Sequence, residues 1–196
     1  MENIEELLKN VRLSQFEMER GEEVDITCIV DLRNFYIRPV KYTEFIEKFE
    51  TIKPQEKPTT LNIQDMVVFN LQLSDSAEKY VRGKILFIDD TDGLKCDIFT
   101  VDYGFFEKSV PLKYIWNCEQ KYLDIPQLIS HCGLARYDPC DGEVEWPQEE
   151  INVFKYYLGT ESVHMRIVEN NIDKLMVELY NDQPEDIASM MGYRIH

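Results

Sequence analysis

Four short apolar segments, each bounded by turn residues, constrain the fold of this chain more than any other feature. They span residues 66–71, 80–88, 94–101 and 105–110. Short strands at even spacing, separated by turn signals, predict a small and strongly bent β-barrel. A hairpin signal at residues 89–93 precedes the third segment, which runs directly into Asp102-Tyr103-Gly104. We therefore expect one barrel in the middle of the chain.

Further strands are expected on both sides of this barrel. Residues 24–30 alternate over their first half and are followed, after a turn, by residues 35–38. Near the other end of the chain, residues 163–168 and 175–180 form a second pair around a turn. Two strands alone make a sheet of marginal stability. We therefore expect the two pairs to join across the central insertion, as a second barrel that is split in sequence.

The remaining segments have the apolar spacing of helices or the composition of linkers. Helices are predicted over residues 2–18, 42–49 and 187–191, after Pro111 and after Pro147. Residues 53–60 hold two prolines and several charges, which is typical of a linker.

Composition narrows the classes of partner. The formal net charge of −16 over 196 residues opposes binding to a nucleic-acid backbone, which needs a basic face. The negative net charge favours a cationic partner. The alternative is an acidic surface that keeps the protein soluble and has no recognition role. The five cysteines are widely spaced and include no CxxC pair, so neither a metal site nor a disulfide framework is expected. No segment is long and apolar enough to span a membrane, and the N-terminus is acidic, unlike a signal peptide. We therefore expect a cytosolic protein.

Several pieces of sequence carry a family resemblance by their order. They are the hairpin at 24–37, Asp65-Met66-Val67, Tyr80-Val81-Arg82-Gly83-Lys84-Ile85, Val101-Asp102-Tyr103-Gly104, Ile125-Pro126-Gln127, Cys132-Gly133-Leu134 and Asp138-Pro139. In this order they resemble the extended Tudor domain of germline Piwi/piRNA-pathway proteins. That family inserts a Tudor barrel into a staphylococcal-nuclease-like OB fold.

The resemblance implies a fold that is mainly β with helices: a Tudor barrel plus a split nuclease-like OB subdomain, joined by a helix. Residues 1–57 are expected to hold the N-terminal helix, the first part of the OB subdomain and the linker helix. Residues 58–120 are expected to be the Tudor barrel, and residues 121–196 the second part of the OB subdomain.

The resemblance also implies a function. Extended Tudor domains recognise arginine-bearing peptides, often symmetrically dimethylated, with a cage of four aromatic side chains and one asparagine. The chain is therefore expected to be a non-catalytic adaptor for the arginine-rich tail of a Piwi-class Argonaute. Its expected place is the cytoplasm, in the perinuclear germ granule or nuage. No cofactor, metal, membrane or direct nucleic-acid partner is implied.

Carrying the family's cage onto this chain leaves it incomplete. The four aromatic positions fall on Leu71, Val81, Thr100 and Tyr103, and the asparagine position holds Phe105. Cation–π contacts are worth about 0.5–2 kcal/mol each, so the loss of three aromatics predicts a preference for unmethylated arginine. A register slip of one residue would bring Tyr80 or Phe99 to the site instead, but neighbours along a strand face opposite ways. With Asp102 from the motif, the predicted ligand-binding residues are Leu71, Val81, Thr100, Asp102, Tyr103 and Phe105.

An acidic rim is expected beside this site, in a groove between the two barrels. Its candidate members are Asp102, Glu107, Asp89, Asp90 and Asp92. Exposed acids are common in turns, so a solvated turn charge is the favoured alternative for each of them, and Asp102 is also consistent with a carboxylate that caps its own turn.

Other functions remain open at this point. One is a scaffold or dimerisation module of germ granules without an arginine ligand. A nuclease would need clustered carboxylates and arginines around a metal, whereas Arg33, Arg38, Arg136 and Arg166 are scattered along the chain, so no enzyme is expected. RNA binding by the OB-like half would suit the fold, but the negative net charge of the chain argues against it.

Overall fold

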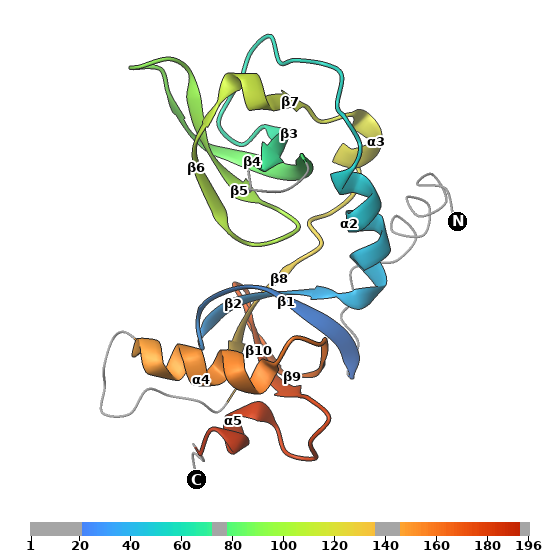
Figure 1. Cartoon of the computed structure of the whole chain (residues 1–196), viewed down its shortest axis with the longest axis vertical. Helices are drawn as coiled ribbons and strands as arrows, with labels where there is room; N and C mark the ends of the chain where they lie inside the picture. Colours follow the sequence, from blue (N-terminus) through green and yellow to red (C-terminus); the bar gives the residue numbers. More distant parts are fainter. Residues whose placement is uncertain (1–20, 72–77, 136–145, 193–196) are drawn as a thin grey trace. The chain divides into compact units, whose positions relative to one another are not determined.

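The computed structural model describes residues 21–71, 78–135 and 146–192. These residues form two compact units. The central unit comprises residues 41–71 and 78–128, and the flanking unit comprises residues 21–40, 129–135 and 146–192. Figure 1 shows the strands of the central unit mainly in green and those of the flanking unit in blue and in yellow to red.

The central unit is built on one antiparallel sheet of five strands, in the order β6-β5-β4-β3-β7. The strands are β3 (Met66–Leu71), β4 (Lys79–Asp89), β5 (Lys95–Thr100), β6 (Phe106–Pro111) and β7 (Ile115–Asn117). The four predicted strands are confirmed to within one residue at each end. Burial alternates along β5, where Cys96, Ile98 and Thr100 face inward.

The fifth strand, β7, corrects the helix that was expected after Pro111. In its place lie a 3-10 turn (Leu112–Tyr114), then β7, then the four-residue helix α3 (Gln120–Leu123). Ile115 is fully buried and lies opposite Phe69 of β3. A strand of three residues is too short to show alternation, so periodicity did not reveal it.

The flanking unit is a closed five-stranded barrel in the order β1-β2-β8-β10-β9. Its strands are β1 (Glu22–Asp31), β2 (Asn34–Pro39), β8 (Ser130–Leu134), β9 (Val163–Asn170) and β10 (Leu175–Tyr180). The two predicted strand pairs join directly where β1 meets β9. On the other side β8, which was not predicted as a strand, pairs with β2 antiparallel and with β10 in parallel. Both pairs therefore belong to one split barrel, as expected, but β8 is needed to close it.

Short helices complete the two units. They are α2 (Thr43–Glu50) in the central unit, and α4 (Gln148–Leu158) and α5 (Ile187–Met190) in the flanking unit. The helix predicted after Pro147 is α4, and its side chains Ile151, Phe154 and Leu158 are buried in the barrel core. The helix predicted over residues 2–18 lies outside the described residues. Within the described ranges, no helix has the length and apolarity needed to cross a membrane.

Candidate functional site around Tyr103

The turn that follows β5 positions the predicted site. The Thr100 hydroxyl donates to the Phe105 carbonyl at 2.9 Å and accepts from the Phe105 amide at 3.0 Å. The Gly104 amide donates to the Thr100 carbonyl at 2.9 Å, and Gly104 has a φ of 86°, where glycine is favoured. Thr100 has no exposed surface. Thr100, which the resemblance places at a cage position, therefore holds the turn closed through its hydroxyl.

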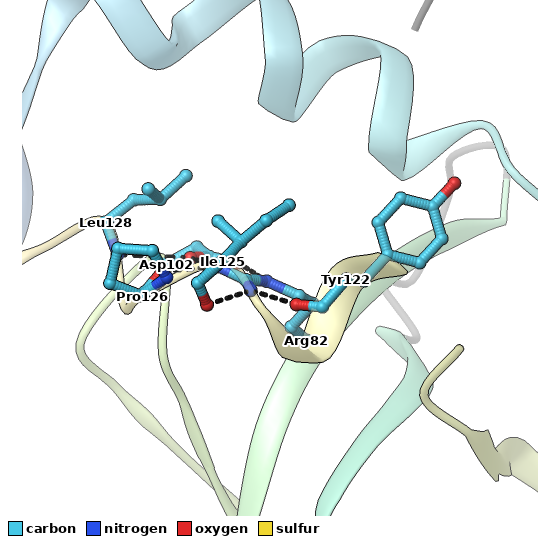
Figure 2. Close-up of polar contacts among 6 residues, drawn as sticks. All are labelled: Arg82, Asp102, Tyr122, Ile125, Pro126 and Leu128. Carbon is cyan, nitrogen blue, oxygen red and sulfur yellow. Dashed lines mark hydrogen bonds and ion pairs between the residues drawn. The ribbon is translucent and has the colours of Figure 1, made fainter. Parts of the chain in front are cut away.

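Asp102 lies in the interior of the central unit, where it pairs with Arg82 of β4 (Figure 2). The Arg82 Nε donates to Asp102 Oδ2 at 2.8 Å and the Nη2 to Oδ1 at 2.7 Å. The two side chains are 0% and 1% exposed. Asp102 does not rim a surface as expected, because both of its oxygens accept from the buried guanidinium.

The rest of the Arg82 guanidinium holds the segment after β7. Its Nη1 donates to the carbonyls of Tyr122 and Ile125, both at 2.8 Å, and its Nη2 to the carbonyl of Pro126 at 2.9 Å. All five N–H groups of this arginine are thereby used. Burial by itself lowers the pKa of Arg82, but the Asp102 carboxylate outweighs burial and raises it. The guanidinium is therefore a charged structural clamp.

The two predicted positions on β3 and β4 differ in exposure. Val81 is 1% exposed and belongs to the core of the sheet, so its side chain does not reach a surface. Leu71 is half-buried at the end of β3, directly opposite Lys79 of β4. Of the alternative aromatics of a slipped register, Tyr80 belongs to the buried cluster against which Tyr103 packs, whereas Phe99 has its partner on β6. Tyr80 is buried with its ring edge-on to Trp116, and Phe99 packs against Phe106.

Tyr103 is half-buried and lies in a small cluster of polar and aromatic side chains. Its hydroxyl donates to Oε1 of Glu50, the last residue of α2. The Lys79 ammonium bonds the other oxygen, Glu50 Oε2, at 2.9 Å. The Phe105 ring lies 6.0 Å from the Tyr103 ring, centre to centre, at 53°. We call Tyr103, Phe105, Glu50 and Lys79 the Tyr103 cluster.

The acids of the β4–β5 hairpin are not part of this cluster. Asp89 Oδ1 accepts from the amide and the hydroxyl of Thr91 at 2.9 and 2.6 Å, so it shapes the turn. Asp92 lies 3.8 Å from Lys95 at the start of β5, whereas Tyr103 follows the end of that strand. Asp89, Asp90 and Asp92 therefore do not rim the predicted site, because a strand's length separates them from it.

Glu50 and Lys79 are the members of the cluster that sequence reasoning missed. Glu50 ends an amphipathic helix and lies 53 residues from Tyr103 in sequence. Its side chain is only 14% exposed, so the carboxylate is held beside the aromatic rings. A carboxylate beside an aromatic ring attracts a cationic side chain through both charge and the ring face.

The central unit also has a cavity of about 960 Å³ at another place. It is lined by residues of the 52–65 segment, the start of β3, β7 and α3, including Glu56, Asp65, Cys118 and Lys121. None of the six predicted site residues lines this cavity. It lies at the first residues of β3, whereas Leu71 is at the last.

Comparisons with known proteins agree with this architecture. The family model of the Tudor domain matches residues 17–136. Comparison with the curated proteins gives no significant match.

Three solved structures are similar over nearly the whole chain. The extended Tudor domain TD3 of mouse TDRD1, in complex with a MILI peptide containing dimethylarginine, has a TM-score of 0.76 at 17% identity, covering 91% of this chain and 92% of that one. The Drosophila melanogaster Papi extended Tudor domain has a TM-score of 0.75 at 17% identity, covering 88% and 96%. The human TDRD1 extended Tudor domain, with a symmetrically dimethylated E2F peptide, has a TM-score of 0.73 at 18% identity, covering 93% and 94%.

The matched model spans more than half of the chain, and the solved structures share its split barrel and inserted sheet. The chain belongs to the Tudor domain family, with the fold of an extended Tudor domain.

Proposed function

We propose that this chain is a non-catalytic adaptor that binds an arginine-bearing peptide at the Tyr103 cluster, with unmethylated arginine preferred. The peptide is the tail of a Piwi-class Argonaute, and the setting is piRNA-pathway assembly in the perinuclear germ granule. The observation that carries the proposal is the Glu50 carboxylate at the hydroxyl of Tyr103. It places a negative charge at the hydroxyl end of an aromatic ring.

The lost cage positions support the preference for unmethylated arginine. An unmethylated guanidinium carries five N–H donors and can engage a carboxylate through two of them at once, whereas methylation keeps the charge but blocks this bidentate contact. Glu50 can accept hydrogen bonds from the N–H groups of an unmethylated guanidinium. The buried Val81 and Thr100 supply no aromatic ring against which the methyl groups of a methylated guanidinium could pack.

Related complexes support an arginine peptide as the ligand. An aspartate-to-alanine variant of the Papi extended Tudor domain has been solved with Piwi N-terminal peptides in which the arginine is unmethylated or symmetrically dimethylated. The mouse TDRD1 domain holds a MILI peptide with dimethylarginine.

Isothermal titration with matched peptides tests the proposal. One peptide carries unmethylated arginine, the second symmetric dimethylarginine, and the third citrulline, which keeps the shape without the charge. We expect the unmethylated peptide to bind most tightly and the citrulline peptide not to bind. A clear gain in affinity on methylation contradicts the proposed preference.

Variants of the cluster assign the site. Tyr103→Ala should weaken binding roughly 2- to 30-fold, the range of one cation–π contact. Glu50→Gln should also weaken peptide binding. Lys79→Ala should strengthen peptide binding, because Lys79 pairs with the Glu50 carboxylate that the peptide arginine would otherwise bind. The matched control is Glu44→Gln, an exposed carboxylate on the same helix. Unchanged binding by Tyr103→Ala would instead favour the scaffold function.

The non-catalytic part of the proposal has its own assay. Labelled single-stranded RNA incubated with the chain and calcium should stay intact. Robust cleavage would overturn the assignment as an adaptor.

A further inference from the structure

Helix α4 ends in the flanking unit, and the chain then turns into β9 (Figure 1). A second cavity lies at this turn. Its volume is about 360 Å³. We call it the α4 pocket; it is lined by Tyr156, Tyr157, Leu158, Gly159, Thr160, Glu161, Ser162, Asn181, Asp182 and Gln183. None of these residues belongs to the Tyr103 cluster.

The walls of the α4 pocket are held by backbone contacts. Helix α4 stops because Gly159 takes a φ of 68°, with its amide donating to the carbonyls of Lys155 and Tyr156 at 3.2 Å. The Asn181 Nδ2 donates to the Tyr157 carbonyl at 2.9 Å, which joins the end of β10 to the end of the helix. The pocket is therefore formed before any ligand arrives.

Two tyrosine rings make a corner in this pocket. Tyr156 is 80% exposed, an unusual degree for so large an aromatic side chain. Its ring centre lies 5.5 Å from that of Tyr157, with the planes at 78°. The Tyr156 ring is therefore open to solvent and nearly perpendicular to the Tyr157 ring.

The charged side chains that line the pocket are both acidic. Glu161 and Asp182 line the pocket, no lining side chain is basic, and neither acid has an ion pair with another described residue. The carboxyl end of α4 adds the partial negative charge of a helix C-terminus, part of which Lys155 in the last turn offsets. An anionic ligand is repelled here, and a cation is attracted.

We infer that the α4 pocket binds the arginine side chain of a basic polypeptide segment. A flat guanidinium stacks on a tyrosine face and donates to carboxylates from the same plane, which matches a pocket lined by an exposed ring and two acids. The net charge of −16 draws such a segment to the chain. This inference does not rest on the proposal for the Tyr103 cluster.

The test is an NMR titration of the whole ¹⁵N-labelled chain with an end-blocked Gly-Arg-Gly-Arg-Gly peptide. The Tyr103→Ala variant is titrated in parallel, so that binding at the two sites is separated. We expect amide shifts at Gly159, Glu161 and Asp182 in both proteins. If the proposal for the Tyr103 cluster fails, shifts around residue 103 are absent from the wild type while those of the α4 pocket remain.

Variants and peptide analogues decide the chemistry. Tyr156→Ala should raise the dissociation constant about two- to fivefold, as expected for an exposed cation–π contact. Glu161→Gln combined with Asp182→Asn should raise it further, whereas Glu169→Gln, about 20 Å away along β9, should leave it unchanged. Absent pocket shifts in the wild type, equal shifts with a citrulline peptide, or full binding by Tyr156→Ala would each overturn the inference.

Discussion

A buried arginine in this fold has a partner for each of its donors. Arg82 uses two N–H groups on Asp102 and three on backbone carbonyls after β7. A buried charge is tolerated only when it is paired and fully hydrogen-bonded. The acid of Asp102-Tyr103-Gly104 is therefore structural, whereas the half-buried tyrosine of the motif bonds Glu50 through its hydroxyl.

Removal of Arg82 should lower the free energy of unfolding because it leaves the buried Asp102 carboxylate without its ion-pair partner. Loss of one partner from a buried ion pair costs about 3–5 kcal/mol, so we expect Arg82→Met to lower the urea midpoint strongly. Lys48→Met breaks an exposed pair with Glu44 and should cost less than about 1 kcal/mol. Adding Asp102→Leu to Arg82→Met should recover part of the loss. Equal midpoints for the two single variants would contradict this account.

At the scale of elements, local pattern and long-range pairing contribute differently. The strands β3 to β6 were predictable because alternation and turn residues mark their ends. The short strands β7 and β8 were not, since β7 has three residues and β8 contains Gly133. The β8 strand exists because its edges find β2 and β10, which come from distant parts of the chain.

The pairing of β4 with β5 depends on a missing side chain at Gly83. A Cβ there would lie 2.3 Å from Ile98 Cγ2 and 2.9 Å from Phe69 Cε1. Overpacking of this kind costs about 1–3 kcal/mol, so Gly83→Ala should lower the thermal midpoint. The control is Gly93→Asn, in an open left-handed turn that asparagine tolerates. A Gly83→Ala midpoint equal to that of the control would argue against close strand packing.

At the scale of the whole molecule, uncharged cysteine and tyrosine side chains with raised pKa values predict a loss of stability at alkaline pH. Burial raises the pKa of the Cys118 thiol to about 11, from an ordinary 9.0, and that of Tyr180 to about 12, from 10.0. Above pH 9 the unfolded thiol ionises first, so the unfolded state binds fewer protons than the folded state. Stability is therefore complete below pH 9 and is lost as pH rises through 11 for Cys118 and 12 for Tyr180.

Unfolding free energy measured from pH 8 to 11 under reducing conditions checks this expectation. Two pKa units correspond to at most about 3 kcal/mol for Cys118. The Cys118→Ala variant should lose less stability than the wild type over this range, because the ionisable thiol is gone. Parallel pH profiles for the two proteins would exclude the thiol as a cause.

The candidate site was only half accessible to sequence reasoning. Tyr103 and Phe105 follow from a local motif, and the structure brings their rings together. Glu50 and Lys79 carry no local signal, because a helix end and a strand start meet only once the chain is folded. The same holds for the α4 pocket, where Asn181 ties β10 to a helix that ended at residue 158.

The sequence by itself determined the strands around Asp102-Tyr103-Gly104 and the split barrel of the flanking unit. These depend on side-chain alternation, turn residues and motif order, which act between near neighbours. Only the tertiary structure decided that Asp102 is buried against Arg82, 20 residues away, and that Tyr103 meets Glu50 across 53 residues. The physical reason is that a charge takes its role from its partner and its burial, and both come from contacts between distant parts of the chain.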